Sequence, residues 1–385
     1  MRILMINHNV AWSGGTFFRA YHFAHQMAQR NHQVTMLTIS PNKRFGFQRD
    51  IRHGFEILET PDWLWGRGRT GWDLWDTLRR IQYSYGQDWD LVHAFDSRPA
   101  VILPALALQR RGVPLILDWA DWWGHGGTIQ ERPTGFVVKQ FISPVETYFE
   151  EAFRTQAQGT TVISLALRDR AIGLGVPPKT IAQIPQGSDI ESIKPQDQKT
   201  CRRVLGLPEQ TPIIGYLGVL NKNDADLLFT AFTHLIQLRP NCQLVMIGRH
   251  KATVPKLANI HQSGFVPPDQ LPIYLGACDL LVLPLKNTIA SRGRWPSKIN
   301  DYLAAGRPIV ACAVGDIRKL FEQHLIGKAT TDKPVPFAEA IATLLDDLPL
   351  RDEMGLNARR VAEEELAWPI IGNQVEFHYM KILRQ

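Results

Sequence analysis

Short apolar runs alternate with amphipathic helical patterns along most of the chain. In the first half, residues 2–6, 33–38, 90–94, 114–117 and 161–163 are apolar runs typical of buried strands. A glycine-containing loop and a helical pattern separate the first two runs. This order of strand, glycine loop, helix and strand predicts the start of a doubly wound parallel sheet.

The second half repeats this pattern after a stretch of prolines, glycines and charges. Apolar runs at 212–217, 243–248, 280–284 and 308–311 alternate with helical segments. We therefore predict an α/β protein with two Rossmann-like, doubly wound domains facing a cleft.

The predicted boundaries follow the composition of the chain. We expect an N-terminal domain over 1–190, an interdomain linker over 191–210 and a C-terminal domain over 211–365. Residues 366–385 should form a C-terminal helix that packs back toward the N-terminal domain.

Composition excludes several classes of protein. Hydrophobic residues make up 44% of the 385 residues and charged residues 21%, which excludes a disordered chain. We see no apolar run long enough to cross a bilayer and no signal peptide, so we expect a cytoplasmic protein. The four cysteines are too far apart for a zinc motif. The net charge of +6 suits an anionic ligand or membrane surface better than nucleic acid.

The loop after the first strand is the first candidate site. Gly14 and Gly15 lie between a strand and a helix, where backbone N–H groups can bind a phosphate, although a plain tight turn explains them equally well. The G-x-G-x-x-G fingerprint is absent, and the second strand ends in Thr38-Ile39-Ser40 instead of an acid. Both features oppose an NAD enzyme.

The most informative segment is 292–310. Arg292 and Arg294 stand in a predicted loop before a helix that begins near Ser297, an arrangement typical of a diphosphate site. Asp301 lies one turn inside this helix and can accept hydrogen bonds from ligand hydroxyls.

These residues carry a family resemblance. Segment 296–310 (PSKINDYLAAGRPIV) is similar to the donor-binding segment of the retaining GT-B glycosyltransferases of family 4, the group 1 glycosyl transferases. Segment 184–189 (IPQGSD) resembles their I-P-N-G-V-D signature, and 264–280 and 354–368 also fit. The resemblance covers nearly the whole chain.

The resemblance implies a function. The N-terminal domain would bind an acceptor, which is a carbohydrate, a lipid-linked sugar or a small molecule, and the C-terminal domain a nucleoside diphosphate sugar. The enzyme would transfer the sugar with retention of anomeric configuration and without a metal or other cofactor. Gly15 would lie near the donor phosphates, Asp301 would hold the ribose hydroxyls, and the backbone around Trp295, Ser297 and Lys298 would face the diphosphate.

The chain departs from the family at two positions. Gly293 replaces the first acid of the E-x7-E motif, and Val219 replaces the usual arginine, which leaves Lys222 as the nearest base in that turn. We infer that Arg292, Arg294 and Lys298 supply the missing cationic charge. Catalysis then consists of positioning and of stabilising the leaving diphosphate, with Arg292 as the candidate catalytic cation.

Acidic and histidine side chains after the strands of the first half are candidates for the acceptor side. Asp118 and Asp121 could orient an acceptor hydroxyl or ammonium group; alternatively one caps a helix and the other pairs with an arginine. His93, Asp96 and His125 are weaker candidates for the same role.

Two further patterns have competing interpretations. Asp224-Ala225-Asp226 matches a D-x-D metal motif, but it opens a helix, where acids act as caps. Segment 62–80 mixes tryptophans with arginines, which suits either peripheral contact with a membrane at its inner face or structural packing.

Two other functions remain open. A nucleotide-sugar epimerase can share the two-domain architecture, and a catalytically degenerate relative would bind a nucleotide or partner without transfer. Gly293 and Val219 are the residues that favour the degenerate alternative.

Overall fold

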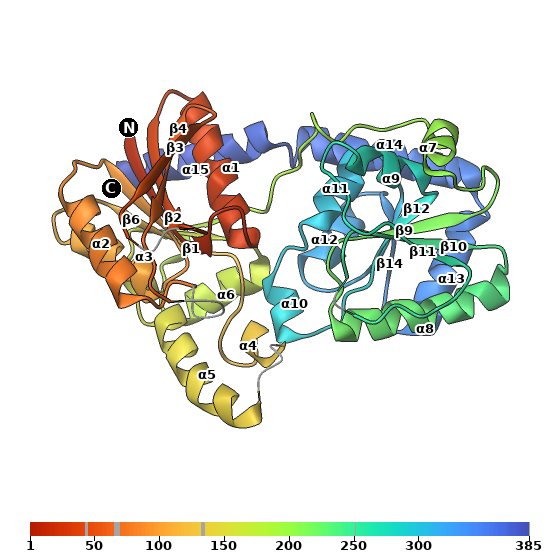
Figure 1. Ribbon diagram of the computed structural model, residues 1–385, viewed down its shortest axis with the longest axis horizontal. Coiled ribbons are helices and arrows are strands. Elements are labelled where there is room, and N and C mark those ends of the chain that lie inside the picture. The colour runs from red at the N-terminus through yellow and green to blue at the C-terminus, as the bar shows by residue number, and fades with distance from the viewer. Residues whose placement is uncertain (43–44, 65–69, 132–134, 251, 385) are drawn as a thin grey trace. The chain divides into compact units, whose positions relative to one another are not determined.

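The computed structural model describes residues 1–42, 45–64, 70–131, 135–250 and 252–384. The chain forms two compact units, the first of Met1–Pro185 with Trp368–Gln385 and the second of Gln186–Ala367 (Figure 1). Residues 191–210, which we expected to be a linker, are part of the second unit and contain a helix there. The helix is α7 (Gln198–Leu205), and the side chain of Asp197 caps it by accepting from the N–H of Thr200 at 2.9 Å.

The first unit is built on an eight-stranded sheet of order β3-β4-β2-β1-β5-β6-β7-β8. The strands are parallel except for β3, which is antiparallel to β4 at the edge. They are β1 (Arg2–Val10), β2 (Gln33–Ile39), β3 (Gln48–Arg52), β4 (Phe55–Thr60), β5 (Leu91–Phe95), β6 (Leu115–Trp119), β7 (Gly159–Val162) and β8 (Ile181–Gln183).

Helices cover the sheet of the first unit (Figure 1). They are α1 (Gly15–Gln29), α2 (Leu74–Tyr85), α3 (Pro99–Gln109), α4 (Thr128–Glu131), α5 (Phe136–Glu151), α6 (Leu165–Gly173) and α15 (Trp368–Leu383). The central strands are continuous apolar runs because both of their faces are covered, as is usual for parallel sheets.

Helix α15 joins the first unit although it is last in the chain. Its apolar residues pack into the core formed by β1 and α1. The ring of Trp368 stacks on His22 with 4.2 Å between centroids. At the polar rim, Arg30 donates to Pro369 O at 2.6 Å and His32 Nε2 lies 2.8 Å from Glu376 Oε1.

The second unit has a six-stranded parallel sheet of order β11-β10-β9-β12-β13-β14. Its strands are β9 (Ile213–Leu217), β10 (Gln243–Ile247), β11 (Ile260–Gln262), β12 (Leu280–Leu283), β13 (Ile309–Cys312) and β14 (Gly327–Thr330). Its helices are α7 (Gln198–Leu205), α8 (Lys222–Leu238), α9 (Leu271–Ala277), α10 (Ile289–Gly293), α11 (Lys298–Ala304), α12 (Asp316–Gln323), α13 (Pro334–Leu345) and α14 (Leu348–Glu364).

The strand orders confirm two Rossmann-like domains. In each sheet the chain moves outward from the first strand on one side and then returns to build the other side. The direction reverses between β1 and β5 in the first unit and between β9 and β12 in the second. Ligands of such sheets bind beyond the carboxyl ends of the strands at the reversal.

Among the described residues, we find no helix with the length and hydropathy needed to cross a membrane.

Candidate active site

Glycines end two neighbouring strands of the second unit. Gly218 follows β9 with φ 87° and Gly248 follows β10 with φ 102°, conformations that favour glycine. The N–H of Gly218 donates to Ile247 O at 2.8 Å, which ties the two turns together. A Cβ on Gly218 would lie 4.0 Å from Cε of Lys298, so the lysine borders this turn.

Lys298 is the first residue of α11 and is half-buried. Its ammonium group lies 4.1 Å from the ring centroid of Tyr216 and donates a hydrogen bond to the Tyr216 hydroxyl. Burial lowers the pKa of Lys298 to about 8, against the opposing charges of Asp224 and Asp301. The hydrogen-bond partner of the Lys298 ammonium is a neutral phenol, so a bound anion would stabilise the charge of Lys298 further.

Asp301 lies one turn further along α11. Burial and the charge of Asp189 raise the pKa of Asp301 to about 7, while Lys298 opposes the shift. This carboxyl group therefore exchanges its proton near neutral pH. When ionised it is a strong acceptor for hydroxyl groups.

Trp295 and Asn300 fix the start of α11. The indole N–H of Trp295 donates to Asn300 Oδ1 at 3.0 Å. The Asn300 amide donates to Gln186 O at 2.9 Å and to Gly187 O at 2.8 Å. Asn300 thus holds α11 against the segment that begins the unit, and Trp295 orients the Asn300 amide. Ser297, which precedes α11, is exposed.

The predicted basic loop is partly helical. Residues Ile289–Gly293 form α10, and the Thr288 side chain caps it by accepting from Ser291 N–H. Arg292 is exposed and its Nε donates to Asn287 Oδ1 at 2.9 Å. Arg294 is half-buried, and its charge acts on the carboxyl group of Asp224.

The D-x-D segment opens α8. Asp224 is buried and accepts from the backbone N–H of Lys286 at 2.9 Å and from the Asn221 amide at 2.8 Å. It therefore fixes a loop and a helix start. Lys222 is the exposed first residue of the same helix.

In the first unit, the β1–α1 turn is open. Gly14 has φ 83°, and a Cβ there would lie 2.6 Å from Asn9 Nδ2. At Gly15, the first residue of α1, a Cβ would meet no atom within 4 Å. The turn requires glycine at position 14 and leaves free space beside position 15.

The structure corrects our prediction for Asp118. Its side chain is fully buried, and both oxygens accept from Arg19 Nε, at 3.1 and 3.0 Å. Oδ1 also accepts from Arg19 Nη2 at 3.0 Å and from the Thr161 hydroxyl at 2.6 Å. A carboxylate held in this way inside the core acts in folding, so the arginine-pairing alternative describes Asp118 better than catalysis.

The other polar candidates of the first unit lie in different surroundings. His93 is buried between the Tyr379 hydroxyl at 2.6 Å and the Thr161 hydroxyl at 3.0 Å, and burial lowers its pKa well below the usual value. It is a core residue. His125 is exposed, and its Nε2 lies 3.3 Å from Glu151. Asp121 is half-buried in the loop after β6.

A buried polar cluster at the β1–β5 reversal includes a residue that our sequence analysis missed. His8 Nδ1 lies 3.4 Å from Asp96 Oδ2, and burial lowers the His8 pKa to about 4. Asp96 has φ 81°, and although burial alone would raise its pKa, His8 and Arg98 hold it below the ordinary value. The run Asn7-His8-Asn9 at the end of an apolar strand was the available signal.

The tryptophan-rich segment 62–80 is described only in part, because residues 65–69 lie outside the described residues. Trp63 stacks on Trp75 with 4.8 Å between centroids, and Trp72 meets Phe149 edge-on at 5.1 Å. Some of its aromatic rings therefore pack against one another.

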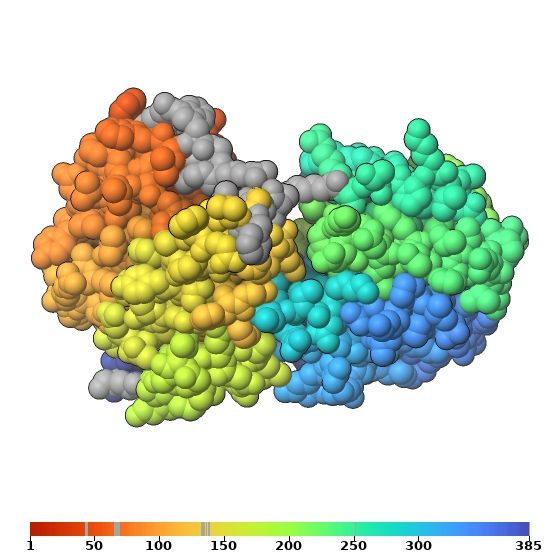
Figure 2. Space-filling model, turned by 90° about the horizontal axis from the view of Figure 1, so that it is seen from below, coloured from red at the N-terminus to blue at the C-terminus, as the bar shows by residue number. Residues whose placement is uncertain are grey.

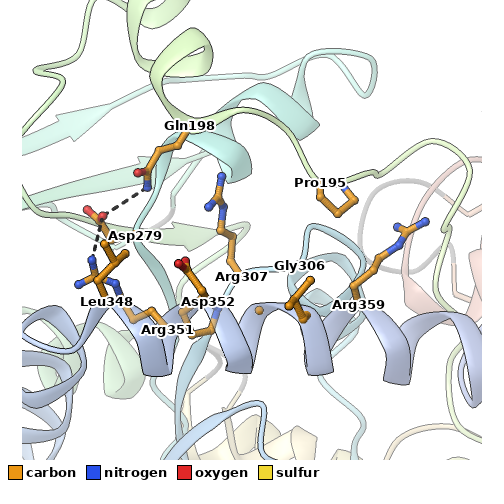
Figure 3. Close-up of a pocket in the computed structure, with 12 residues that line it drawn as sticks. Pro195, Gln198, Asp279, Gly306, Arg307, Leu348, Arg351, Asp352 and Arg359 are labelled. Carbon is orange, nitrogen blue, oxygen red and sulfur yellow. Dashed lines mark hydrogen bonds and ion pairs between the residues drawn. The ribbon is translucent and has the colours of Figure 1, made fainter.

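The second unit also has a cavity of about 310 Å³ beside α14. It lies at the amino ends of β12 and β13, near Asp279 and Arg307 (Figure 3). Its arginines hold backbone groups: Arg307 donates to Gln196 O at 3.0 Å, and Arg359 donates to Ile193 O and Ala304 O, both at 2.8 Å. The cavity is at the amino ends of these strands, whereas the glycine turns are at the carboxyl ends of β9 and β10.

Comparisons with known proteins agree with this arrangement. Residues 14–187 match the family described as "Glycosyl transferase 4-like domain", and residues 211–347 match "Glycosyl transferases group 1". The alpha-D-kanosaminyltransferase of Streptomyces kanamyceticus is 23% identical over 391 residues, covering 93% of this chain and 97% of that protein.

One further sequence relative and one solved structure show how much of the chain the similarity covers. D-inositol 3-phosphate glycosyltransferase of Corynebacterium diphtheriae is 26% identical over 222 residues, or 52% of this chain, and the aligned part spans 51% of that relative's length. HepE of Anabaena, solved in complex with UDP and glucose, shares the fold with a TM-score of 0.73 at 18% identity, covering 99% of this chain and 100% of that one. With both Rossmann-like units matched in order along the sequence, the chain belongs to the group 1 glycosyl transferases of family 4, which have the GT-B architecture.

Proposed function

We propose that the protein transfers a sugar from a nucleoside diphosphate sugar to an acceptor, with retention of anomeric configuration and without a metal ion. The observation that carries the proposal is the half-buried ammonium of Lys298 beside the glycine turn after β9. The name of the Streptomyces relative describes a sugar transfer, and HepE binds UDP and glucose; both support the proposal.

On the donor side, Lys298 binds the diphosphate. Arg294 and Arg292 add positive charge in place of the arginine that Val219 replaces. Asp301 accepts hydrogen bonds from the ribose hydroxyls, and the backbone of Trp295 and Ser297 faces the phosphates.

The chemistry follows from this charge distribution. The bond between the anomeric carbon and the diphosphate oxygen breaks, and a bond from the acceptor oxygen forms on the same face of the sugar. The departing diphosphate takes the acceptor proton. Negative charge develops on the leaving oxygen, so fixed cations lower the barrier. Lys298 and Arg294 supply this charge where other enzymes use a metal ion, and the Asp224 carboxylate is occupied by Lys286 and Asn221.

On the acceptor side, the turn at Gly14 and Gly15 offers backbone N–H groups to a phosphate, and Asp121 orients the acceptor hydroxyl. The acceptor is a carbohydrate, a lipid-linked sugar or a small molecule, and transfer takes place in the cytoplasm at the inner face of a membrane. Membrane contact through segment 62–80 has separate support in the exposed apolar side chains of α2.

Calorimetry with UDP, GDP and ADP, each with magnesium and with EDTA, tests the donor site. We expect one nucleotide to bind equally well in both conditions. Lys298→Met should weaken that nucleotide about tenfold or more, because a charge-assisted contact is lost. Lys319→Met, which removes an exposed lysine of α12, is the matched control and should leave affinity unchanged.

Absence of binding by all three nucleotides, or equal affinity of the Lys298→Met protein, contradicts the donor site. Once a donor is known, the anomeric proton coupling of the product in NMR distinguishes retention from inversion. Tight nucleotide binding without transfer to any acceptor indicates the degenerate relative that Gly293 and Val219 suggest.

A further inference from the structure

His250 lies in the loop that follows β10, two residues after the Gly248 turn, and is half-buried. Its two ring nitrogens have no contact with solvent, and neither forms a hydrogen bond with any residue that the structure describes. A buried polar atom without a partner costs free energy, and in a native protein it indicates a bound water, ion or ligand. His250 is therefore a candidate ligand-binding residue.

The surroundings of His250 include residues of the candidate donor site. Its ring lies 6.2 Å from the ring of Tyr216, centroid to centroid, with 48° between the two planes. The ammonium group of Lys298 lies 4.1 Å from the centroid of the same Tyr216 ring. The Tyr216 hydroxyl accepts from Lys298 and donates to Val219 O at 3.0 Å, so it has no proton left for His250. His250 and Lys298 thus both border Tyr216, and neither nitrogen of the imidazole is used.

The charges near His250 suit an anion. Burial lowers the pKa of His250 and the positive charge of Lys298 lowers it further, whereas the carbonyl groups of Met246 and Gly218 oppose the shift. Asp224, whose charge acts on Lys298, already accepts two hydrogen bonds from elsewhere. An anion in contact with His250 and Lys298 would supply a negative charge to both.

We propose that His250 binds the diphosphate of the donor nucleotide, with a ring N–H donating to a phosphate oxygen beside Lys298. The neighbouring ammonium favours an anionic group over a neutral nucleobase as the partner of this imidazole. Val219 brings no charge to the turn after β9, and Arg292 is exposed and bonded to Asn287. This inference rests on the proposed sugar transfer and adds a residue to its donor site.

Calorimetry with pyrophosphate and with UDP, GDP and ADP tests the contact. His250→Phe keeps an aromatic ring but removes both nitrogens. We expect this variant to bind pyrophosphate, and whichever nucleotide binds, about tenfold more weakly, because a hydrogen bond to a charged group is lost. His250→Gln retains an N–H donor and should lose less affinity. Since His250→Phe also removes two buried nitrogens, its unfolding midpoint should stay the same or rise.

Nitrogen-15 NMR of histidine-labelled protein gives a measurement that a purely structural role would not change. The ring signals of His250 are assigned by their loss in His250→Gln. They should shift when pyrophosphate or the binding nucleotide is added. They should not shift with uridine, guanosine or adenosine, which lack phosphates.

His234→Phe is the matched control. His234 is also half-buried, and it lies on α8, which is green in Figure 2 and belongs to the same unit. This variant should bind pyrophosphate and the nucleotides as the unchanged protein does, and the His250 signals should respond as before.

Four results would overturn the inference. Full affinity of His250→Phe refutes the contact but leaves the donor site intact if Lys298→Met still weakens binding. Equal losses for nucleosides and nucleotides would show that His250 contacts the base or the ribose instead. Weaker binding by His250→Phe with a lower unfolding midpoint and unshifted His250 signals identifies a structural role. No binding of any probe to the unchanged protein refutes both this contact and the donor site.

Discussion

The buried pair of Arg19 and Asp118 predicts that Asp118→Asn destabilises the first unit without removing a catalytic group. Arg19 is 1% exposed and Asp118 is completely buried. Asparagine keeps one acceptor oxygen but turns an NH₂ group toward a guanidinium, which can only donate. The substitution therefore leaves an uncompensated charge inside the core.

The expected magnitude follows from this burial. Removing one partner of a buried ion pair costs about 3–5 kcal/mol of unfolding free energy. For a unit of about 200 residues, each kcal/mol lowers the midpoint of thermal unfolding by about 2–4 °C, so we expect a decrease of about 6–20 °C. Replacing both residues with Arg19→Met/Asp118→Leu should cost less than the single change, because no charge is then left unpaired.

Differential scanning calorimetry resolves the transition of the first unit, and donor turnover is measured well below that transition. Asp169→Asn is the control, since its carboxylate is 66% exposed and pairs with Arg168 at 3.1 Å. An exposed pair contributes little, so this variant should stay within about 1 kcal/mol of the unchanged protein.

One result would refute the reasoning. If Asp118→Asn abolishes turnover while the unfolding midpoint stays the same, the carboxylate acts in the reaction and its pairing with Arg19 is secondary.

Three further predictions concern single residues or pairs. Gly14→Ala should cost about 1–2 kcal/mol or more, because φ is positive and the new Cβ meets Asn9, whereas Gly15→Ala should be neutral in urea unfolding; equal effects contradict the geometry. Nucleotide affinity should fall above pH about 8, where Lys298 loses its proton, and below about 7, where Asp301 gains one. In calorimetry with a dideoxy nucleotide, which lacks the ribose hydroxyls, the affinity should fall only above pH about 8. If its affinity also falls below pH about 7, Asp301 does not bind the ribose hydroxyls. Trp295→Phe should lower the stability of the second unit by about 1–2 kcal/mol in urea unfolding, since Asn300 Oδ1 loses its donor; an unchanged midpoint would show that this bond contributes nothing.

The sequence determined the fold class through local patterns. Buried parallel strands must be apolar on both faces, so the runs that became β1, β2, β9, β10 and β12 were visible directly. The edge strand β3 and its neighbour β4 were not predicted. The exposed, mixed sequence of β3 has no continuous apolar run, and its pairing with β4 is what makes it a strand.

The candidate donor residues could be singled out from the sequence because they are close together in the chain. Arg292, Arg294, Lys298 and Asp301 lie within ten residues, on α10, at its end and on α11. The environment of Lys298 was not readable, since Tyr216 comes from a strand 82 residues earlier.

Only the tertiary structure could decide which polar side chains point into the core. Asp118 stands at the end of an apolar run in the sequence, as a catalytic acid would. In the structure, however, Arg19, which is 99 residues away, donates hydrogen bonds to both of its oxygens. Likewise, Asp76 and Arg80 of α2 are completely buried, and Arg80 donates to Asn7 O and to the Thr60 hydroxyl. Periodicity along the chain specifies which residues share a face, whereas long-range contacts decide whether that face meets the core or the solvent.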